Sequence, residues 1–147
     1  FHSLSDREIM EEIAGVVKAC LTGFEDHVLP RLLDVTPEME IPVGVVGKGD
    51  PEHFFFEGVK VYAIPDYVFV REGVWHILDW KSGAAKEAHR EQVGLYALWA
   101  LEKHQVPPEQ VILSLEYLRH GEHQTFTVTP EDLERAEALL KESVSPA

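Results

Sequence analysis

The stretch HILDWKSGAA, residues 76–85, reads as an apolar strand that finishes in charged residues. Successive side chains of a strand point to opposite faces of a sheet, so Asp79 and Lys81 should project together while Trp80 projects to the other side. The following Ser82-Gly83 pair is typical of a strand end. A carboxylate beside an ammonium at this position has two interpretations: an exposed ion pair, which contributes little to stability, or one half of an active site.

A second carboxylate comes from the segment before this stretch. Residues 59–71 predict a strand that is bent, bulged or at a sheet edge near Pro65, because proline cannot donate a hydrogen bond to a neighbouring strand. A tight turn centred near Glu72-Gly73 then pairs this strand with the opening stretch. That hairpin would place Asp66 opposite Asp79, so two carboxylates should meet at one end of the sheet.

The chemistry that these side chains support is phosphodiester hydrolysis. Paired carboxylate oxygens at Asp66 and Asp79 suit Mg²⁺ or Mn²⁺, with water and a substrate phosphate as the remaining ligands. The ammonium of Lys81 could orient or deprotonate the attacking water, or stabilise negative charge. Gln92 and Tyr96, four residues apart on the predicted next helix, should share one helix face behind this site.

The rest of the chain predicts a mixed sheet flanked by helices. Ser5 and Glu8 form a capping-box pattern at the start of a helical region, and Thr129-Pro130 marks another helix start. The predicted order is α, β, β, β, α, β, β, α, which indicates an α/β or α+β class. The expected helices are 6–33 (with a break near Gly23), 86–103 and 130–143; the other expected strands are 38–46, 110–118 and 124–129. The aromatic run 53–57 is a candidate for an additional strand.

Composition sets limits on the function. The 147 residues suit one domain, 1–147, and because the chain begins at Phe1 we expect it to be a piece of a larger protein. No stretch is apolar enough to span a membrane, and with Cys20 as the single cysteine we expect a cytoplasmic location and no four-cysteine site. The net charge of −13 argues against unaided DNA binding. It fits cation binding, a basic partner domain, or simple solubility.

The ordered set of Pro65-Asp66, then Asp79-Trp80-Lys81, then Gln92-x-x-x-Tyr96 resembles the PD-(D/E)XK nuclease superfamily, and within it the RecB-like exonuclease branch. The resemblance covers roughly residues 36–130. It implies a restriction-endonuclease-like fold with an αβββαβ core. It also implies a metal-dependent DNA nuclease, specifically an exonuclease, that acts in recombination and repair or as part of a helicase–nuclease.

The resemblance also implies a role for each matching residue. Asp66 and Asp79 would bind Mg²⁺ or Mn²⁺ with the backbone carbonyl of Trp80, Lys81 would be the catalytic lysine, and Gln92 and Tyr96 would position the DNA strand. A histidine from an N-terminal helix is often a further ligand, for which His27 and His2 are the candidates. DNA would be the substrate and a helicase or basic domain a partner, without an iron–sulfur cluster in this chain. The alternatives are an inactive nuclease-fold scaffold and a nuclease of phage or CRISPR-adaptation type.

Overall fold

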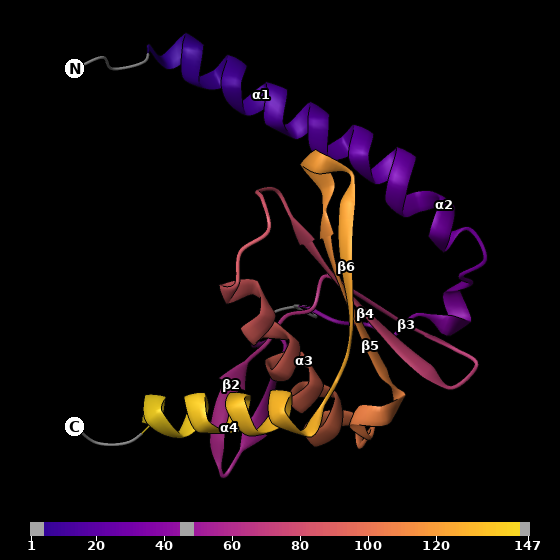
Figure 1. The fold of residues 1–147 in the computed structure, drawn as a ribbon, viewed down its shortest axis with the longest axis vertical. Coiled ribbons are helices and arrows are strands. Elements are labelled where there is room, and N and C mark those ends of the chain that lie inside the picture. Colours follow the sequence, from indigo (N-terminus) through magenta and orange to yellow (C-terminus); the bar gives the residue numbers. More distant parts are fainter. Residues whose placement is uncertain (1–4, 45–48, 145–147) are drawn as a thin grey trace.

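Four strands form the sheet at the centre of the molecule, in the order β3-β4-β5-β6 (Figure 1). A computed structural model gives this arrangement and describes residues 5–44 and 49–144. The pairs β3–β4 and β5–β6 are antiparallel, whereas β4 and β5 are parallel because helix α3 crosses between them. The mixed sheet with flanking helices confirms the predicted fold class. The bounds are β3 Tyr67–Arg71, β4 Val74–Lys81, α3 Ala88–His104, β5 Val111–Tyr117 and β6 Glu122–Thr127.

The β3–β4 hairpin has the register that the sequence predicts. Tyr67 lies opposite Leu78, so the same register continued by one residue brings Asp66 opposite Asp79. The turn at Glu72-Gly73 has φ values of 52° and 80°. Positive φ at both central residues is what a two-residue hairpin turn requires, because its twist then matches that of the strands.

Residues 59–71, predicted as one strand, form two strands, β2 (Val59–Tyr62) and β3. Chain pairing stops at Tyr62 and resumes at Tyr67, after Pro65, and β3 lies at an edge of the sheet, as proline favours. The earlier strand, β2, pairs with β1 (His53–Phe56) in a separate two-stranded ribbon. This ribbon packs against α3 (Figure 1).

The strand predicted at 38–46 is wrong over its described part. Residues 37–39 form the short 3₁₀ helix η2 (Pro37–Met39), and only Glu40 bridges β3, opposite Phe69. Pro42 cannot donate to a ladder and Gly44 has a φ of 108°, so the backbone leaves the sheet edge after Ile41. Residues 45–46 of the prediction lie outside the described residues.

Helix α3 packs on one face of the sheet. The predicted helix 86–103 begins two residues later than expected, and Val93, Ala97 and Ala100 of this helix are fully buried, whereas Leu101 is half-buried. Trp99 is also fully buried, and its indole N–H donates to Glu52 at 3.0 Å. The apolar contacts of this helix with the sheet form the core that holds the strand ends in place.

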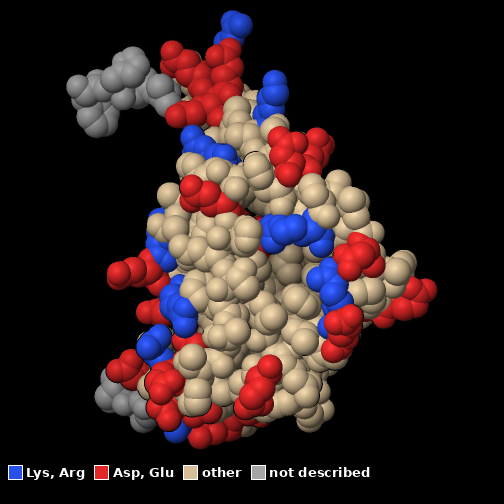
Figure 2. Space-filling model, turned by 45° about the vertical axis from the view of Figure 1, so that its right-hand side comes forward, with Lys and Arg blue, Asp and Glu red and all other residues tan. Residues whose placement is uncertain are grey.

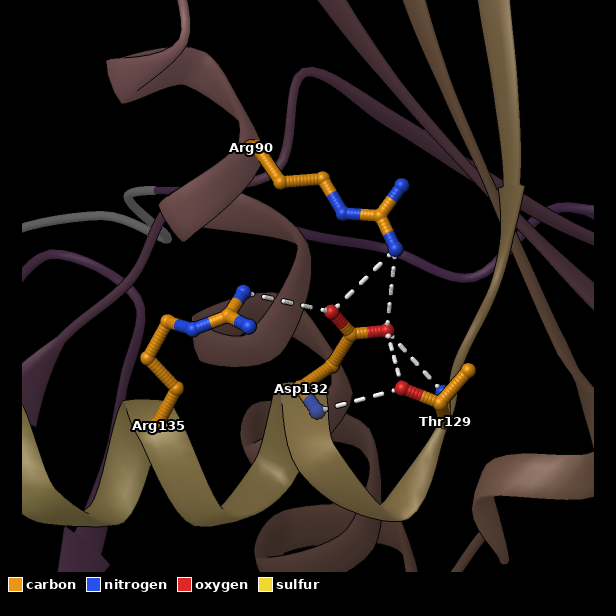
Figure 3. Close-up of polar contacts among 4 residues, drawn as sticks. All are labelled: Arg90, Thr129, Asp132 and Arg135. Carbon is orange, nitrogen blue, oxygen red and sulfur yellow. Dashed lines mark hydrogen bonds and ion pairs between the residues drawn. The ribbon is translucent and has the colours of Figure 1, made fainter.

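Helix α4 (Pro130–Val144) packs on α3 and starts at the predicted cap (Figures 1 and 3). The backbone N–H of Asp132 donates to the Thr129 hydroxyl at 3.2 Å, and Thr129 N–H donates to the Asp132 carboxylate at 3.0 Å. Arg90 of α3 donates to both oxygens of this carboxylate at 3.3 Å, and Arg135 lies 3.8 Å away. One buried carboxylate therefore caps α4 and joins it to α3.

The N-terminal helical region is continuous. Ser5 and Glu8 form the predicted capping box, and helix α1 runs from Asp6 to Gly23. The expected break near Gly23 is instead a π-helical turn, η1 (Phe24–Val28), which leads into α2 (Leu29–Leu32). A Cβ at Gly23 would lie 1.7 Å from the carbonyl oxygen of Leu118, so glycine allows α1 to reach the short helix η4 (Leu118–His120).

Acidic side chains are spread unevenly over the surface. On the face in Figure 2 they gather over the projecting α1 and along the lower edge, whereas the middle is mostly uncharged with Lys and Arg side chains around it. Within residues 5–44 and 49–144, none of the helices is both long enough and apolar enough to cross a membrane.

Candidate active site

The strand end that carries Asp79 and Lys81 points its charged side chains toward α3. Asp79 is 4% exposed, and its Oδ2 lies 2.6 Å from Lys81 Nζ. Ile77, two residues earlier on the same strand face, is fully buried, which explains why Asp79 enters the protein rather than solvent. The interpretation as an exposed ion pair is therefore wrong, because both charges lie in a largely dehydrated environment.

Helix α3 supplies the hydrogen-bond partners of these two charges. The Tyr96 hydroxyl donates to Asp79 Oδ1 at 3.0 Å, and Lys81 Nζ donates to Gln92 Oε1 at 2.5 Å. Burial and the Asp79 charge raise the pKa of Tyr96 well above its ordinary value, so this hydroxyl stays a neutral donor. In this structure Gln92 and Tyr96 position the ammonium and the carboxylate; a contact of either with DNA stays a prediction.

Asp66 completes the pair of carboxylates. It lies between Pro65 and the start of β3, and its Oδ2 accepts a hydrogen bond from the backbone N–H of Trp80 at 2.7 Å. Although the residue is exposed as a whole, partial desolvation of the carboxyl raises its pKa to about 6. The Trp80 N–H opposes this shift, the Asp79 carboxylate adds to it and Lys81 opposes it. The pKa of Asp66 is therefore sensitive to the charges of both Asp79 and Lys81.

The Trp80 side chain anchors the strand end from the opposite face. Its ring packs edge-on against Phe24 of η1, with ring centroids 5.6 Å apart, and lies stacked 6.5 Å from Tyr67 of β3. This agrees with the alternation expected from the sequence. It leaves the Trp80 main chain between the two carboxylates, where its N–H already binds Asp66.

The structure adds a tyrosine that the sequence reasoning missed. Tyr117, at the end of β5, is 1% exposed and lies beside Lys81 in the parallel register. Its hydroxyl lies 3.1 Å from Nδ1 of His89, the second residue of α3. Tyr117 is placed here by the parallel pairing of β4 with β5. This pairing joins segments that are distant in the chain, so no local sequence pattern predicts it.

The histidine candidates are placed differently. His27 lies in η1, with its ring against Gly121: a Cβ at Gly121 would come within 2.6 Å of His27 Cδ2 and Nε2. His2 lies outside the described residues. Within residues 5–44 and 49–144 no three or more His, Cys, Asp or Glu side chains are grouped to hold a metal, so His27 does not form such a group with Asp66 and Asp79. Its role as a ligand stays a prediction.

The donor set nevertheless fits a hard divalent cation. Asp79 Oδ2 is buried and accepts no well-aligned hydrogen bond from the described residues, although Lys81 Nζ is close to it. Such an oxygen has a lone pair left for a cation. Mg²⁺ typically uses one or two carboxylates and keeps waters or substrate phosphate as its other ligands, so Asp66, Asp79 and the carbonyl of Trp80 would suffice for a site of this kind.

Comparison with known proteins agrees with this geometry. The model of the PD-(D/E)XK nuclease superfamily matches residues 4–145, nearly the whole chain. The chain therefore belongs to the PD-(D/E)XK nuclease superfamily, and its mixed sheet and flanking helices are consistent with the restriction-endonuclease-like fold of that superfamily. A search of the curated proteins finds no significant match to the chain.

Proposed function

We propose that this protein is a divalent-metal-dependent DNA nuclease that hydrolyses phosphodiester bonds at the end of β4. The observation that carries the proposal is the convergence of two carboxylates and an ammonium at one strand end. Asp66 accepts a hydrogen bond from the backbone N–H of Trp80, and Asp79 lies beside Lys81, two residues further along β4. Membership of a nuclease superfamily supports the same chemistry.

Each side chain has a defined part in this proposal. Asp66 and Asp79 would hold Mg²⁺ or Mn²⁺ together with the carbonyl of Trp80, and the bound ion would lower the pKa of a water and offset charge on the phosphate. Tyr96 holds the Asp79 carboxylate in its orientation through Oδ1. Gln92 holds the ammonium of Lys81, which would orient the attacking water or stabilise developing negative charge.

A nuclease assay with Mn²⁺ or Mg²⁺ on single- and double-stranded DNA tests the proposal. We expect the wild-type protein to cut and the variants Asp79→Asn and Lys81→Ala to lose nearly all activity. The control is Lys60→Ala on β2, where the lysine pairs with the exposed Asp50 and not with the carboxylates of the site. This variant should cut normally. Equal cleavage by wild type, Asp79→Asn and Lys81→Ala would refute the assignment of the site.

The finer assignment to a RecB-like exonuclease in recombination and repair is supported by the spacing of Gln92 and Tyr96. Both side chains contact the charged pair from one helix face, as the sequence pattern suggested. Cleavage assays on linear and on covalently closed circular DNA of the same sequence distinguish exonuclease from endonuclease activity. An exonuclease degrades the linear form and spares the circle, whereas cutting of the circle would identify an endonuclease. The phage or CRISPR-adaptation alternative shares this chemistry, so only genomic context separates it.

One observation favours a second candidate, a nuclease-fold scaffold without activity. The described residues provide two carboxylates at the site and no third ligating side chain grouped with them. Calorimetry with Mn²⁺ separates the candidates. Binding that Asp66→Ala abolishes would count against the scaffold, whereas absence of binding by the wild type would exclude the metal-dependent nuclease. The same titration of His27→Ala tests whether His27 is a ligand.

A further inference from the structure

A cleft of about 430 Å³ opens between the N-terminal helical region and the turn after β5. One wall belongs to α1 and η1, and the other to η4 and Gly121. Its lining contains four side chains that are or can become cationic, Lys18, His27, Arg119 and His120. A single carboxylate, Asp26, lines it as well, so the balance of charge in the cleft is opposite to the −13 of the whole chain.

The two permanent cations of the cleft are not neutralised by neighbours. Lys18 and Arg119 are exposed, and within residues 5–44 and 49–144 neither side chain makes a hydrogen bond or an ion pair. By contrast, Arg31, Arg71 and Arg90 each form an ion pair with a carboxylate. Unpaired cations that converge on one hollow of an acidic protein form a local site for an anion.

The turn at Gly121 shapes this hollow. Gly121 has a φ of 64°, and a Cβ there would come within 2.6 Å of two atoms of the His27 ring. Glycine therefore lets the imidazole of His27 lie directly against the turn that carries Arg119 and His120. The cations of the two walls are brought to one cleft by this close approach.

Both walls are joined directly to the end of the active-site strand. On one side η4 follows Tyr117, which pairs with Lys81 in the parallel register. On the other side Phe24, the first residue of η1, packs its ring on Trp80 at 5.6 Å. The Trp80 ring lies on the sheet face opposite to Asp79 and Lys81, so a chain of phosphates has to cross the ends of β4 and β5 to pass from the cleft to the carboxylates.

We propose that this cleft binds the phosphodiester backbone of DNA next to the active site, with Lys18 and Arg119 as the phosphate contacts. The inference rests on the proposed nuclease function and adds the surface that an acidic chain needs to hold its substrate. Each Lys or Arg that neutralises a phosphate releases counterions, so binding should weaken with salt in proportion to the number of contacts. Contacts of this type do not select a base sequence.

Fluorescence anisotropy with labelled DNA, in EDTA to prevent cleavage and over a series of salt concentrations, tests the proposal. A plot of log affinity against log salt concentration has a negative slope. For the double variant Lys18→Gln/Arg119→Gln we expect this slope to become shallower by about 1.8 for duplex and about 1.4 for single-stranded DNA. At fixed low salt we expect a loss of about two- to fivefold in affinity for each cation removed, the size of an exposed ion pair.

Three controls separate local binding from net charge. The double variant Lys60→Gln/Arg135→Gln makes the same change in net charge on β2 and α4, away from the cleft, and should keep the wild-type slope. Asp26→Asn removes the carboxylate of the cleft and should tighten binding. Lys18→Arg should bind like the wild type. An unchanged slope in Lys18→Gln/Arg119→Gln, or an equal loss in both double variants, would overturn the proposal.

The same variants distinguish failure of this inference from failure of the proposed function. Mn²⁺ binding measured by calorimetry should be equal in wild type and Lys18→Gln/Arg119→Gln, because neither residue belongs to the carboxylate site. If the wild type cuts DNA and the double variant binds and cuts it equally well, the cleft is wrong and the nuclease stands. If the wild type neither binds Mn²⁺ nor cuts, the nuclease is wrong whatever the anisotropy shows.

Discussion

Replacing Tyr96 with phenylalanine removes one oxygen from the core and the only hydroxyl donor that Asp79 Oδ1 has among the described contacts. The hydroxyl lies 3.0 Å from this oxygen, Tyr96 is 5% exposed and Asp79 is 4% exposed, so water has little access to replace the lost donor. A hydrogen bond to a charged group contributes about 1.5–3 kcal/mol. Because Lys81 still lies 2.6 Å from the other oxygen, Asp79 keeps a counter-charge. We therefore expect the lower half of this range, about 1.5–2 kcal/mol of unfolding free energy.

Urea denaturation followed by tryptophan fluorescence measures this loss. For a chain of this length 1 kcal/mol corresponds to about 2–4 °C in Tm, so Tm should fall by roughly 3–8 °C. If Tyr96 orients the catalytic carboxylate, cleavage of DNA should also fall, by about tenfold or more at a temperature where the variant is folded, because misplacement of a catalytic group by about 1 Å is costly.

Tyr62→Phe is the matched control. Tyr62 lies on β2 and is 53% exposed, so the same chemical change should alter neither stability nor cleavage. Wild-type stability of Tyr96→Phe would show that the hydroxyl is not a significant donor to Asp79. Reduced stability with unchanged cleavage would show that Tyr96 is structural and does not position a catalytic carboxylate.

Three further predictions follow from other contacts. Gly94→Ala should lower the unfolding free energy by about 1–3 kcal/mol in urea denaturation, because the new Cβ would lie 2.5 Å from the Asp132 carbonyl oxygen, whereas Gly15→Ala, with nothing within 4 Å, should raise it by up to about 1 kcal/mol; the opposite order would refute the packing of α3 on α4. Burial raises the pKa of Asp132, but hydrogen bonds from Thr129 and the charge of Arg90 outweigh it, so the folded pKa lies below the ordinary value. The stability that Asp132 contributes is therefore complete above about pH 4 and is lost as pH falls through the folded pKa, and an Asp132→Asn variant should show a flatter fall of Tm in acid. Saturating Mn²⁺ should raise Tm, by the equivalent of about 2.7 kcal/mol at a hundredfold excess over Kd, EDTA should reverse this, and Asp66→Ala should show no rise.

The two proposals place a cation site and a phosphate site in different parts of this acidic chain. Carboxylates at the end of β4 are suited to cations, while the cleft beside η4 gathers cations suited to phosphates. Because long-range charge is screened within about 8–10 Å at physiological salt, a local cationic cleft can bind a polyanion on a protein of net charge −13.

Local patterns predicted most of the elements correctly. The capping box at Ser5 and the cap at Thr129 each depend on residues within one helical turn. The hairpin register depended on a two-residue turn and therefore needed only the position of Glu72-Gly73. The prediction of a strand at 38–46 was wrong because the residue types in this segment do not by themselves keep a chain paired. Pro42 and the backbone at Gly44 carry the chain away from the edge of β3.

Local periodicity along the chain was enough to predict which residues meet across the hairpin and which share a helix face. Asp66 opposite Asp79, and Gln92 in line with Tyr96, follow from strand and helix periods, which are local properties of the backbone. How these groups are buried and paired depends on tertiary packing. The packing of α3 on the sheet buries Asp79 and directs Tyr96 to the carboxylate and Gln92 to the ammonium. The parallel pairing of β4 with β5 places Tyr117 beside Lys81 and brings η4, with Arg119 and His120, into contact with β4. Contacts between segments distant in the chain depend on how whole faces pack, and no local period encodes them.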